Sequence, residues 1–122
     1  MPNPIVHFEI PATDVEKIKR FYTEVFGWKM TTDPSMPHYT SVETADGNMG
    51  IGGGIMKRQS PQHTPTNYAM VASVTEFAEK VKQQGGQVVV PKTAIPNMGY
   101  FAVCLDPENN PIGLFETDPT AA

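Results

Sequence analysis

The sequence is poor in features that mark several classes of protein. It has one cysteine in 122 residues, which excludes an internal disulfide and suits a reducing compartment. Its 9 basic residues are outnumbered by 13 acidic ones, so we expect no nucleic-acid partner. The first residues carry neither a charged segment nor a long apolar run. We therefore expect no secretory signal, no membrane association and a cytoplasmic protein.

Two motifs of catalysis and phosphate binding are also missing. The glycine-rich segment at 50–54 is followed by neither a helical pattern nor a Lys-Ser/Thr pair, so it does not predict a phosphate loop. No serine stands in a nucleophile-elbow context. Cys104 lies in an apolar run without a basic neighbour to activate its thiol, and we interpret it as a core residue.

What the sequence does contain is an internal repeat with a period near sixty residues. A strand-like run at 5–10 leads into a Thr-x-x-Glu segment at 13–16 and a helical pattern that stops at Gly27. A second run at 67–71 leads into Ser-x-x-Glu at 73–76 and a helical pattern that stops at Gly85. Both tetrapeptides are typical of capping boxes, and glycine is typical of helix ends. The repeat predicts two modules.

Periodicity and turn residues give the order of elements within each module. We expect helices at 14–26 and 74–84, and strands at 4–10, 28–32, 38–44, 49–56, 66–72, 87–91, 99–105 and 111–117. Pro11 is expected to end the first strand, and Asp46-Gly47 to form a hairpin turn. A mobile loop is expected at 93–98.

These elements predict one α+β domain of two βαβββ modules. Module one covers 1–57, a linker 58–65, module two 66–118, and a frayed tail 119–122. Each helix covers one face of a small antiparallel sheet. Since neither sheet can bury its other face alone, we expect the two to enclose a shared half-barrel cleft.

Three segments resemble one known family over nearly the whole chain. They are His7–Asp14, Phe21–Trp28 and Asp106–Glu116. Together they resemble the vicinal oxygen chelate superfamily, which includes glyoxalases, extradiol dioxygenases and bleomycin-resistance proteins, and most closely a glyoxalase-like subgroup without an assigned reaction. The resemblance implies the glyoxalase/bleomycin-resistance/dihydroxybiphenyl-dioxygenase fold, a small-molecule ligand in the cleft and a homodimer.

The resemblance also implies a metal site built from four strands. Its ligands come from the first and last strand of each module, and here His7 and Glu116 match two of the four positions. The last strand of module one offers Gly53, Gly54 and Ile55, and the first strand of module two offers Thr66, Asn67 or Tyr68, depending on the alignment. A divalent ion (Zn, Ni, Fe or Mn) would therefore have an incomplete site.

Other residues are candidates for the cleft. Glu9 shares a strand face with His7 and would orient the imidazole or act as a base, unless that face is turned to solvent. Glu116 is the second candidate base. Tyr68 would either offer its hydroxyl to a ligand or serve as a core aromatic residue. Tyr68, Thr66, Gly54 and Met98 are the expected cavity residues.

Three functions follow from these candidates. The first is a metal-assisted lyase, isomerase or dioxygenase, in which the ion polarises paired substrate oxygens. The second is metal-free binding or sequestration of a small molecule, as in bleomycin-resistance relatives. The third is a metal-free enzyme with Glu9 or Glu116 as the base. A binding protein would tolerate His7→Ala with little loss of ligand affinity, whereas a metal enzyme would not.

Overall fold

The computed structural model describes residues 2–45 and 49–122. The chain divides into two compact units. The N-terminal unit is His7–Pro65, and the C-terminal unit is Thr66–Ala122 together with the residues up to Val6. The Pro4 carbonyl accepts a hydrogen bond from the Met70 N–H, which ties the start of the chain to the C-terminal unit. The predicted Asp46-Gly47 turn lies outside the described residues.

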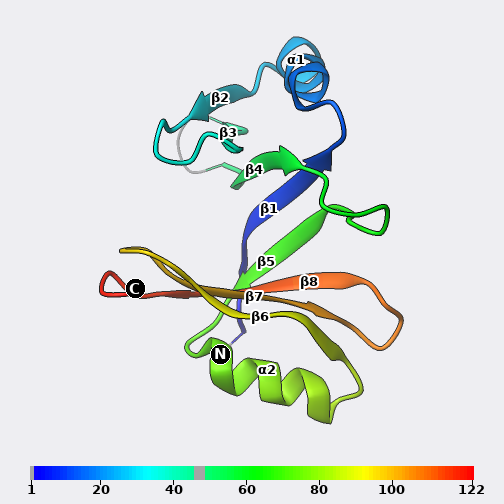
Figure 1. Cartoon of the computed structure of the whole chain (residues 1–122), viewed down its shortest axis with the longest axis vertical. Helices are drawn as coiled ribbons and strands as arrows, with labels where there is room; N and C mark the ends of the chain where they lie inside the picture. Colours follow the sequence, from blue (N-terminus) through cyan, green and yellow to red (C-terminus); the bar gives the residue numbers. More distant parts are fainter. Residues whose placement is uncertain (1, 46–48) are drawn as a thin grey trace. The chain divides into compact units, whose positions relative to one another are not determined.

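The N-terminal unit contains a four-stranded sheet and one helix (Figure 1). Its elements are β1 (Ile5–Ala12, of which Ile5 and Val6 count with the C-terminal unit), α1 (Val15–Phe26), β2 (Lys29–Thr32), β3 (Tyr39–Glu43) and β4 (Gly52–Lys57). The strand order is β2-β3-β4-β1. The β1–β4 pair is parallel, and the other two pairs are antiparallel.

The C-terminal unit repeats this arrangement (Figure 1). Its elements are β5 (Thr66–Met70), α2 (Val74–Gln83), β6 (Gln87–Ile95), β7 (Gly99–Leu105) and β8 (Pro111–Thr117). The order β5-β8-β7-β6 again has the first and last strands parallel and the others antiparallel. Two βαβββ modules of the α+β class are thereby confirmed, although each sheet is mixed because its first and last strands run parallel.

Each unit packs its helix on one face of its sheet. In the N-terminal unit the buried core of Ala12, Val42 and Ile55 receives Val15 and Ile18 from α1. In the C-terminal unit Val74 and Phe77 of α2 pack on a core cluster that contains Ala102, Cys104 and Leu114, which confirms Cys104 as a core residue.

We call the face of each sheet that lies opposite its helix the distal face. Side chains alternate along a strand, so β1 directs Phe8 and Ile10 toward α1 and His7 and Glu9 to the distal face.

The helix ends agree in part with the predicted caps. Ser73 caps α2, its side chain accepting from the Glu76 N–H at 3.1 Å. The cap of α1 is Asp14, not Thr13, and its carboxylate accepts from the Lys17 N–H at 3.1 Å. Aspartate and threonine are both good N-cap residues, and Asp14, which lies one position closer to the helix, takes the place of the predicted Thr13. Gly27 follows α1 with φ 71° and Gly85 follows α2 with φ 93°, as expected of terminal glycines.

Several predicted boundaries are wrong, among them the following three. β1 continues through Pro11 to Ala12, because proline is tolerated where the neighbouring strand does not need its missing N–H. The first half of the predicted mobile loop at 93–98 belongs to β6, which pairs with β7 as far as Ile95, and residues 96–98 form the turn between the two strands. The tail is not frayed, since Ala121 is 2% exposed and its carbonyl accepts from the Asn97 N–H at 2.9 Å.

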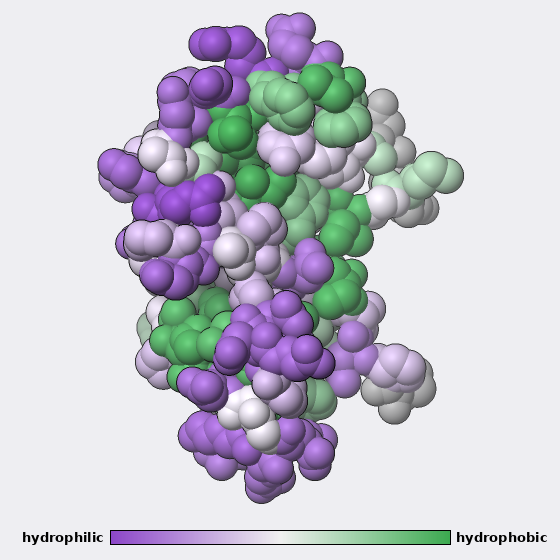
Figure 2. All heavy atoms as spheres, turned by 90° about the vertical axis from the view of Figure 1, so that its right-hand side faces the viewer, coloured by the Kyte–Doolittle hydropathy of each residue, from purple (hydrophilic) through white to green (hydrophobic). Residues whose placement is uncertain are grey.

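The surface carries apolar side chains among polar ones, seen as green between purple in Figure 2. Phe21, Val25 and Phe26 of α1 are each more than half exposed. None of the helices among the described residues has the length and apolarity needed to span a membrane.

Candidate functional site

The N-terminal unit places a tyrosine across a strand of glycines. β3 directs Thr40 and Val42 toward α1 and therefore directs Tyr39 to the distal face. A Cβ built on Gly54 would lie 2.1 Å from both Cζ and the hydroxyl oxygen of Tyr39. The Tyr39 ring thus occupies the space above Gly54 and reaches over β4 toward β1, where Gly54 lies opposite Glu9. Glycine at position 54 makes this crossing possible.

The Tyr39 hydroxyl ends between two polar side chains of β1. It lies 2.6 Å from His7 Nε2, and it also forms a side-chain hydrogen bond with Glu9. A tyrosine hydroxyl has one proton to donate, and an ionised carboxylate can only accept. Tyr39 therefore donates to Glu9, and His7 donates its Nε2–H to the Tyr39 oxygen. We call His7, Tyr39 and Glu9 the distal triad.

Burial and the Glu9 charge set the protonation of the distal triad. Burial lowers the pKa of His7 from its ordinary value, and the Glu9 charge opposes this in part. Burial also raises the pKa of Tyr39, as do the charge of Glu9 and the hydrogen bond with it. Tyr39 is therefore neutral at pH 7 and His7 is predominantly so.

The sequence predicts His7, Glu9 and Gly54 as site residues but does not predict Tyr39 there. The available signal was the run Gly52-Gly53-Gly54, since glycine inside a strand indicates the close approach of another group. The structure identifies both groups. The Tyr39 ring covers Gly54 on the distal face, and the Phe8 ring and carbonyl approach Gly53, whose added Cβ would lie 2.5 Å from each.

In the C-terminal unit, too, a tyrosine ring packs on a glycine of a neighbouring strand. Tyr68 on β5 lies beside Gly113 on β8, and a Cβ on Gly113 would lie 2.2 Å from the Tyr68 ring. The Tyr68 ring also meets Phe101 edge-on, with centroids 6.5 Å apart. Tyr68 is 5% exposed and Thr66 is 4% exposed, so both of these predicted cavity residues are buried.

Glu116 faces the helix rather than the distal face. Along β8 it follows Leu114, which is buried in the core under α2. Its Oε1 accepts from the Val74 N–H at 2.9 Å, in the first turn of α2. This N–H is one of those that a helix leaves without an intrahelical partner. The resemblance implied that Glu116 points into the cleft, but the structure gives its carboxylate the role of anchoring a helix N-terminus.

Glu116→Gln is expected to lower the free energy of unfolding by about 0.5–1 kcal/mol, because it removes a negative charge from the positive end of α2. Urea denaturation of both proteins measures the change. Glu24→Gln, on the exposed surface of α1, is the control and should have little effect. Equal stability of the Glu116→Gln and wild-type proteins would contradict the anchoring role.

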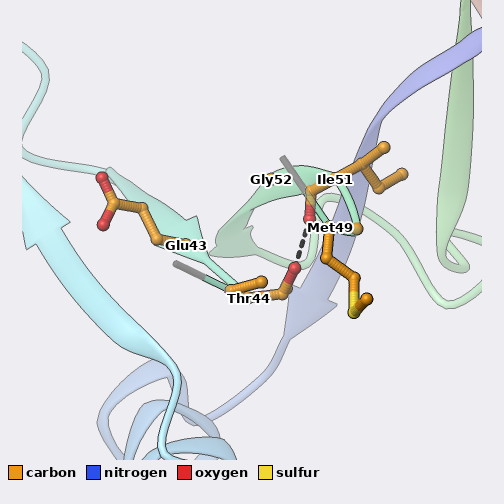
Figure 3. Close-up of a pocket in the computed structure, with 7 residues that line it drawn as sticks. Glu43, Thr44, Met49, Ile51 and Gly52 are labelled. Atoms are coloured by element: carbon orange, nitrogen blue, oxygen red, sulfur yellow. Dashed lines mark hydrogen bonds between the residues drawn. The ribbon is translucent and has the colours of Figure 1, made fainter. Parts of the chain in front are cut away.

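Met98 and a hollow beside β3 and β4 are not part of the distal triad. Met98, a predicted cavity residue, is 58% exposed and lies in the turn between β6 and β7. A hollow of about 320 Å³ lies at the β3–β4 connection (Figure 3) and is lined by Glu43, Thr44, Ala45, Met49, Gly50, Ile51 and Gly52. There the Thr44 hydroxyl donates to the Ile51 carbonyl, and among the described residues of the lining Glu43 is the one that is ionisable.

The residues implied by the family resemblance do not fit a metal centre. Position 54 has no side chain, and the Tyr39 ring takes the space that a ligand there would need. The Glu116 carboxylate is bonded to the N-terminus of α2. Within residues 2–45 and 49–122, no three His, Cys, Asp or Glu side chains lie close enough together to hold an ion. A catalytic divalent ion normally takes three protein ligands or more.

Comparison with known proteins places this chain among glyoxalase-like and bleomycin-resistance-like sequences. Residues 4–45 match the family described as bleomycin resistance protein-like N-terminal. A glyoxylase-like domain-containing protein of Didymella fabae is 30% identical over 110 residues, covering 84% of each chain. The putative glyoxylase CFP32 of Mycobacterium bovis is 28% identical over 116 residues, covering 90% of this chain and 44% of the relative. The chain thus spans less than half of that mycobacterial relative.

A solved structure shares the fold. The glyoxalase/bleomycin resistance protein/dioxygenase superfamily member of Vibrio splendidus 12B01 superposes with a TM-score of 0.65 at 9% identity, covering 96% of this chain and 100% of that one. This likeness agrees with the two βαβββ modules described above. The relative from Didymella fabae shows that the similarity extends to the amino-acid sequence. The chain belongs to the glyoxalase/bleomycin-resistance/dioxygenase superfamily, the vicinal oxygen chelate proteins.

Proposed function

We propose that this protein binds a small organic molecule without a bound metal, and that the distal triad recognises a polar group of that ligand. The observation that carries the proposal is the Tyr39 ring over Gly54, with its hydroxyl hydrogen-bonded to His7 and Glu9. The Tyr39 ring covers Gly54, one of the positions at which the resemblance implies a metal ligand on the last strand of module one. The triad offers hydrogen-bonding groups instead, which are the usual means of orienting a ligand in a pocket.

Metal content tests the first half of the proposal. Untagged protein is dialysed and titrated calorimetrically with Ni²⁺, Zn²⁺, Fe²⁺ and Mn²⁺, alongside the double variant His7→Ala/Glu116→Ala. We expect that the wild-type protein binds none of these ions stoichiometrically, and that the double variant therefore gives the same titration. Tight binding by the wild type that the double variant loses would overturn the proposal and restore metal-assisted lyase, isomerase or dioxygenase chemistry as the better account.

A ligand screen in EDTA tests the second half. Fragments that bind the wild-type protein are measured again with Tyr39→Phe, which removes the hydroxyl shared by His7 and Glu9. Hydrogen bonds that involve charged groups are worth about 1.5–3 kcal/mol, so we expect affinity to fall at least about tenfold. Tyr100→Phe is the matched control, because Tyr100 packs toward α2. Equal loss in both variants, or in neither, would place the ligand elsewhere.

We also propose a homodimer, as the resemblance implies. The exposed apolar side chains of Phe21, Val25 and Phe26 support an association through α1. Sedimentation equilibrium at micromolar concentration measures the oligomeric state, and a monomer throughout would contradict the proposal.

A further inference from the structure

The solvent-facing surface of α1 carries charges as well as apolar side chains. The side of the helix that packs on its own sheet carries three residues, Val15, Ile18 and Tyr22. On a neighbouring side, Phe21 is 52% and Val25 56% exposed. Lys17 and Glu24 are exposed beside Phe21, four residues before it and three after it, and this spacing places side chains on one stripe of a helix. We call Lys17, Phe21, Glu24 and Val25 the α1 stripe.

The α1 stripe presents both signs of charge to a partner. Among residues 2–45 and 49–122, neither Lys17 nor Glu24 forms an ion pair through its side chain. Glu16 and Lys19, by contrast, pair with each other at 3.1 Å. A lipid surface or a nucleic acid selects clustered basic residues, so a stripe with a carboxylate in it fits neither well. It fits a partner that has an apolar surface with the same two charges in the opposite order.

A second copy of this chain meets that requirement when the two helices are antiparallel. Lys17 and Glu24 lie on the same flank of Phe21, because seven residues make nearly two turns. A two-fold axis beside Phe21 reverses the helix direction and keeps this flank on the same side of the pair. At about 1.5 Å per residue, Lys17 lies about 6 Å before Phe21 and Glu24 about 4.5 Å after it. Lys17 of one copy and Glu24 of the other therefore lie within about 2 Å of each other along the helix axis.

We infer that two copies of the protein associate through antiparallel α1 helices, with a two-fold axis at Phe21 and with Lys17 of each copy beside Glu24 of the other. This inference rests on the proposed homodimer and deepens it, since it names the direction, the symmetry and the charged contacts of the interface. Because the symmetry repeats the contact, two ion pairs flank the apolar side chains of both copies. The order of charges along the α1 stripe then decides which copies can pair.

Charge reversals test this order by sedimentation equilibrium. Lys17→Glu places two carboxylates together at both contacts, and Glu24→Lys places two ammonium groups there. Like charges across an interface repel, so we expect each variant alone to raise the dimer dissociation constant at least about tenfold. An equimolar mixture of the two variants should recover dimers, since a mixed dimer has opposite charges at both contacts. The variant with both substitutions should dimerise as the wild type does.

Thr23→Lys is the matched control for Glu24→Lys. Thr23 is exposed and adjacent in sequence, but it is turned about 100° away from Glu24 around the helix. The same new charge at this position should leave the dissociation constant unchanged. Phe21→Ser removes the apolar centre of the contact and should raise the constant at least about tenfold. Melting temperatures show that each variant is folded, and if Phe21→Ser does not fold, the mixing experiment decides the matter.

The outcomes separate this inference from the proposed function. Dimers that persist in both single reversals would overturn the α1 contact and leave the homodimer intact. Weaker dimers without recovery in the mixture would also overturn it, because the two charges would then not pair between copies. A monomeric wild type would overturn both contact and homodimer, and binding to anionic lipid vesicles that Phe21→Ser abolishes would then identify a lipid surface as the partner. Metal-free ligand binding is judged separately, by calorimetry and Tyr39→Phe.

Discussion

Gly113→Ala is expected to lower the free energy of unfolding by about 3 kcal/mol. The added Cβ would lie 2.2, 2.4 and 2.5 Å from Cδ2, Cε2 and Cγ of Tyr68. Cγ is the first atom of the ring, so the ring can leave only by a change of the Tyr68 χ1 rotamer or a shift of β5. Tyr68 is also buried, which leaves little space to receive it. Equilibrium unfolding in urea measures the loss.

A double-mutant cycle with Tyr68→Ala separates this clash from other effects of alanine on the strand. Once the ring is absent, Gly113→Ala should cost well under 1 kcal/mol, because the new methyl group meets no ring atom. The same cost in both backgrounds would show that the Tyr68 ring is not what requires glycine at this position.

Gly54→Ala is expected to act less on stability and more on the distal triad. The atoms that its Cβ would meet are Cζ, the hydroxyl oxygen and Cε1, at the far end of the Tyr39 side chain. The ring can swing away, so we expect a loss of only about 1 kcal/mol in stability. The hydroxyl must then leave His7 and Glu9, and ligand affinity should fall at least about tenfold, as with Tyr39→Phe.

Ring currents report this displacement directly. The side-chain signals of His7 should change in Gly54→Ala and in Tyr39→Phe, whereas Gly113→Ala alters a contact within the C-terminal unit and serves as the control. If Gly54→Ala left both the His7 signals and ligand affinity unchanged, the ring over Gly54 would have no part in recognition.

Much of the fold follows from local patterns in the sequence. The spacing of Val15, Ile18 and Tyr22 predicts α1, and the glycines at 27 and 85 mark both helix ends. Strand pairing is less local. The segment at 93–98 has the proline and polar residues of a loop, yet tertiary pairing with β7 extends the strand to Ile95. Pro11 gave a false boundary for a similar reason. Its effect on a strand depends on whether a neighbouring strand would accept a hydrogen bond from an N–H at that position.

The candidate site could be predicted only in part. His7 and Glu9 share a strand face by simple alternation, so their proximity follows from the sequence. Tyr39 joins them from 32 positions away along the chain, by crossing a strand whose glycines leave room for a ring. The glycine run indicated that something approaches, but no local rule says which side chain. Glu116 was misplaced because the family resemblance supplied its orientation, whereas its neighbours Leu114 and Val74 place it toward α2.

Long-range ¹H–¹⁵N correlation NMR of the His7 imidazole nitrogens distinguishes a hydrogen-bonded, metal-free His7 from a metal ligand. We expect the Nε2–H tautomer, a pKa below the ordinary value of 6.5, and a spectrum that one equivalent of Zn²⁺ leaves unchanged. These results would establish His7 as a hydrogen-bond donor to Tyr39 in a metal-free site. Proton loss from Nε2 together with a stoichiometric shift on adding Zn²⁺ would contradict the account and identify His7 as a metal ligand.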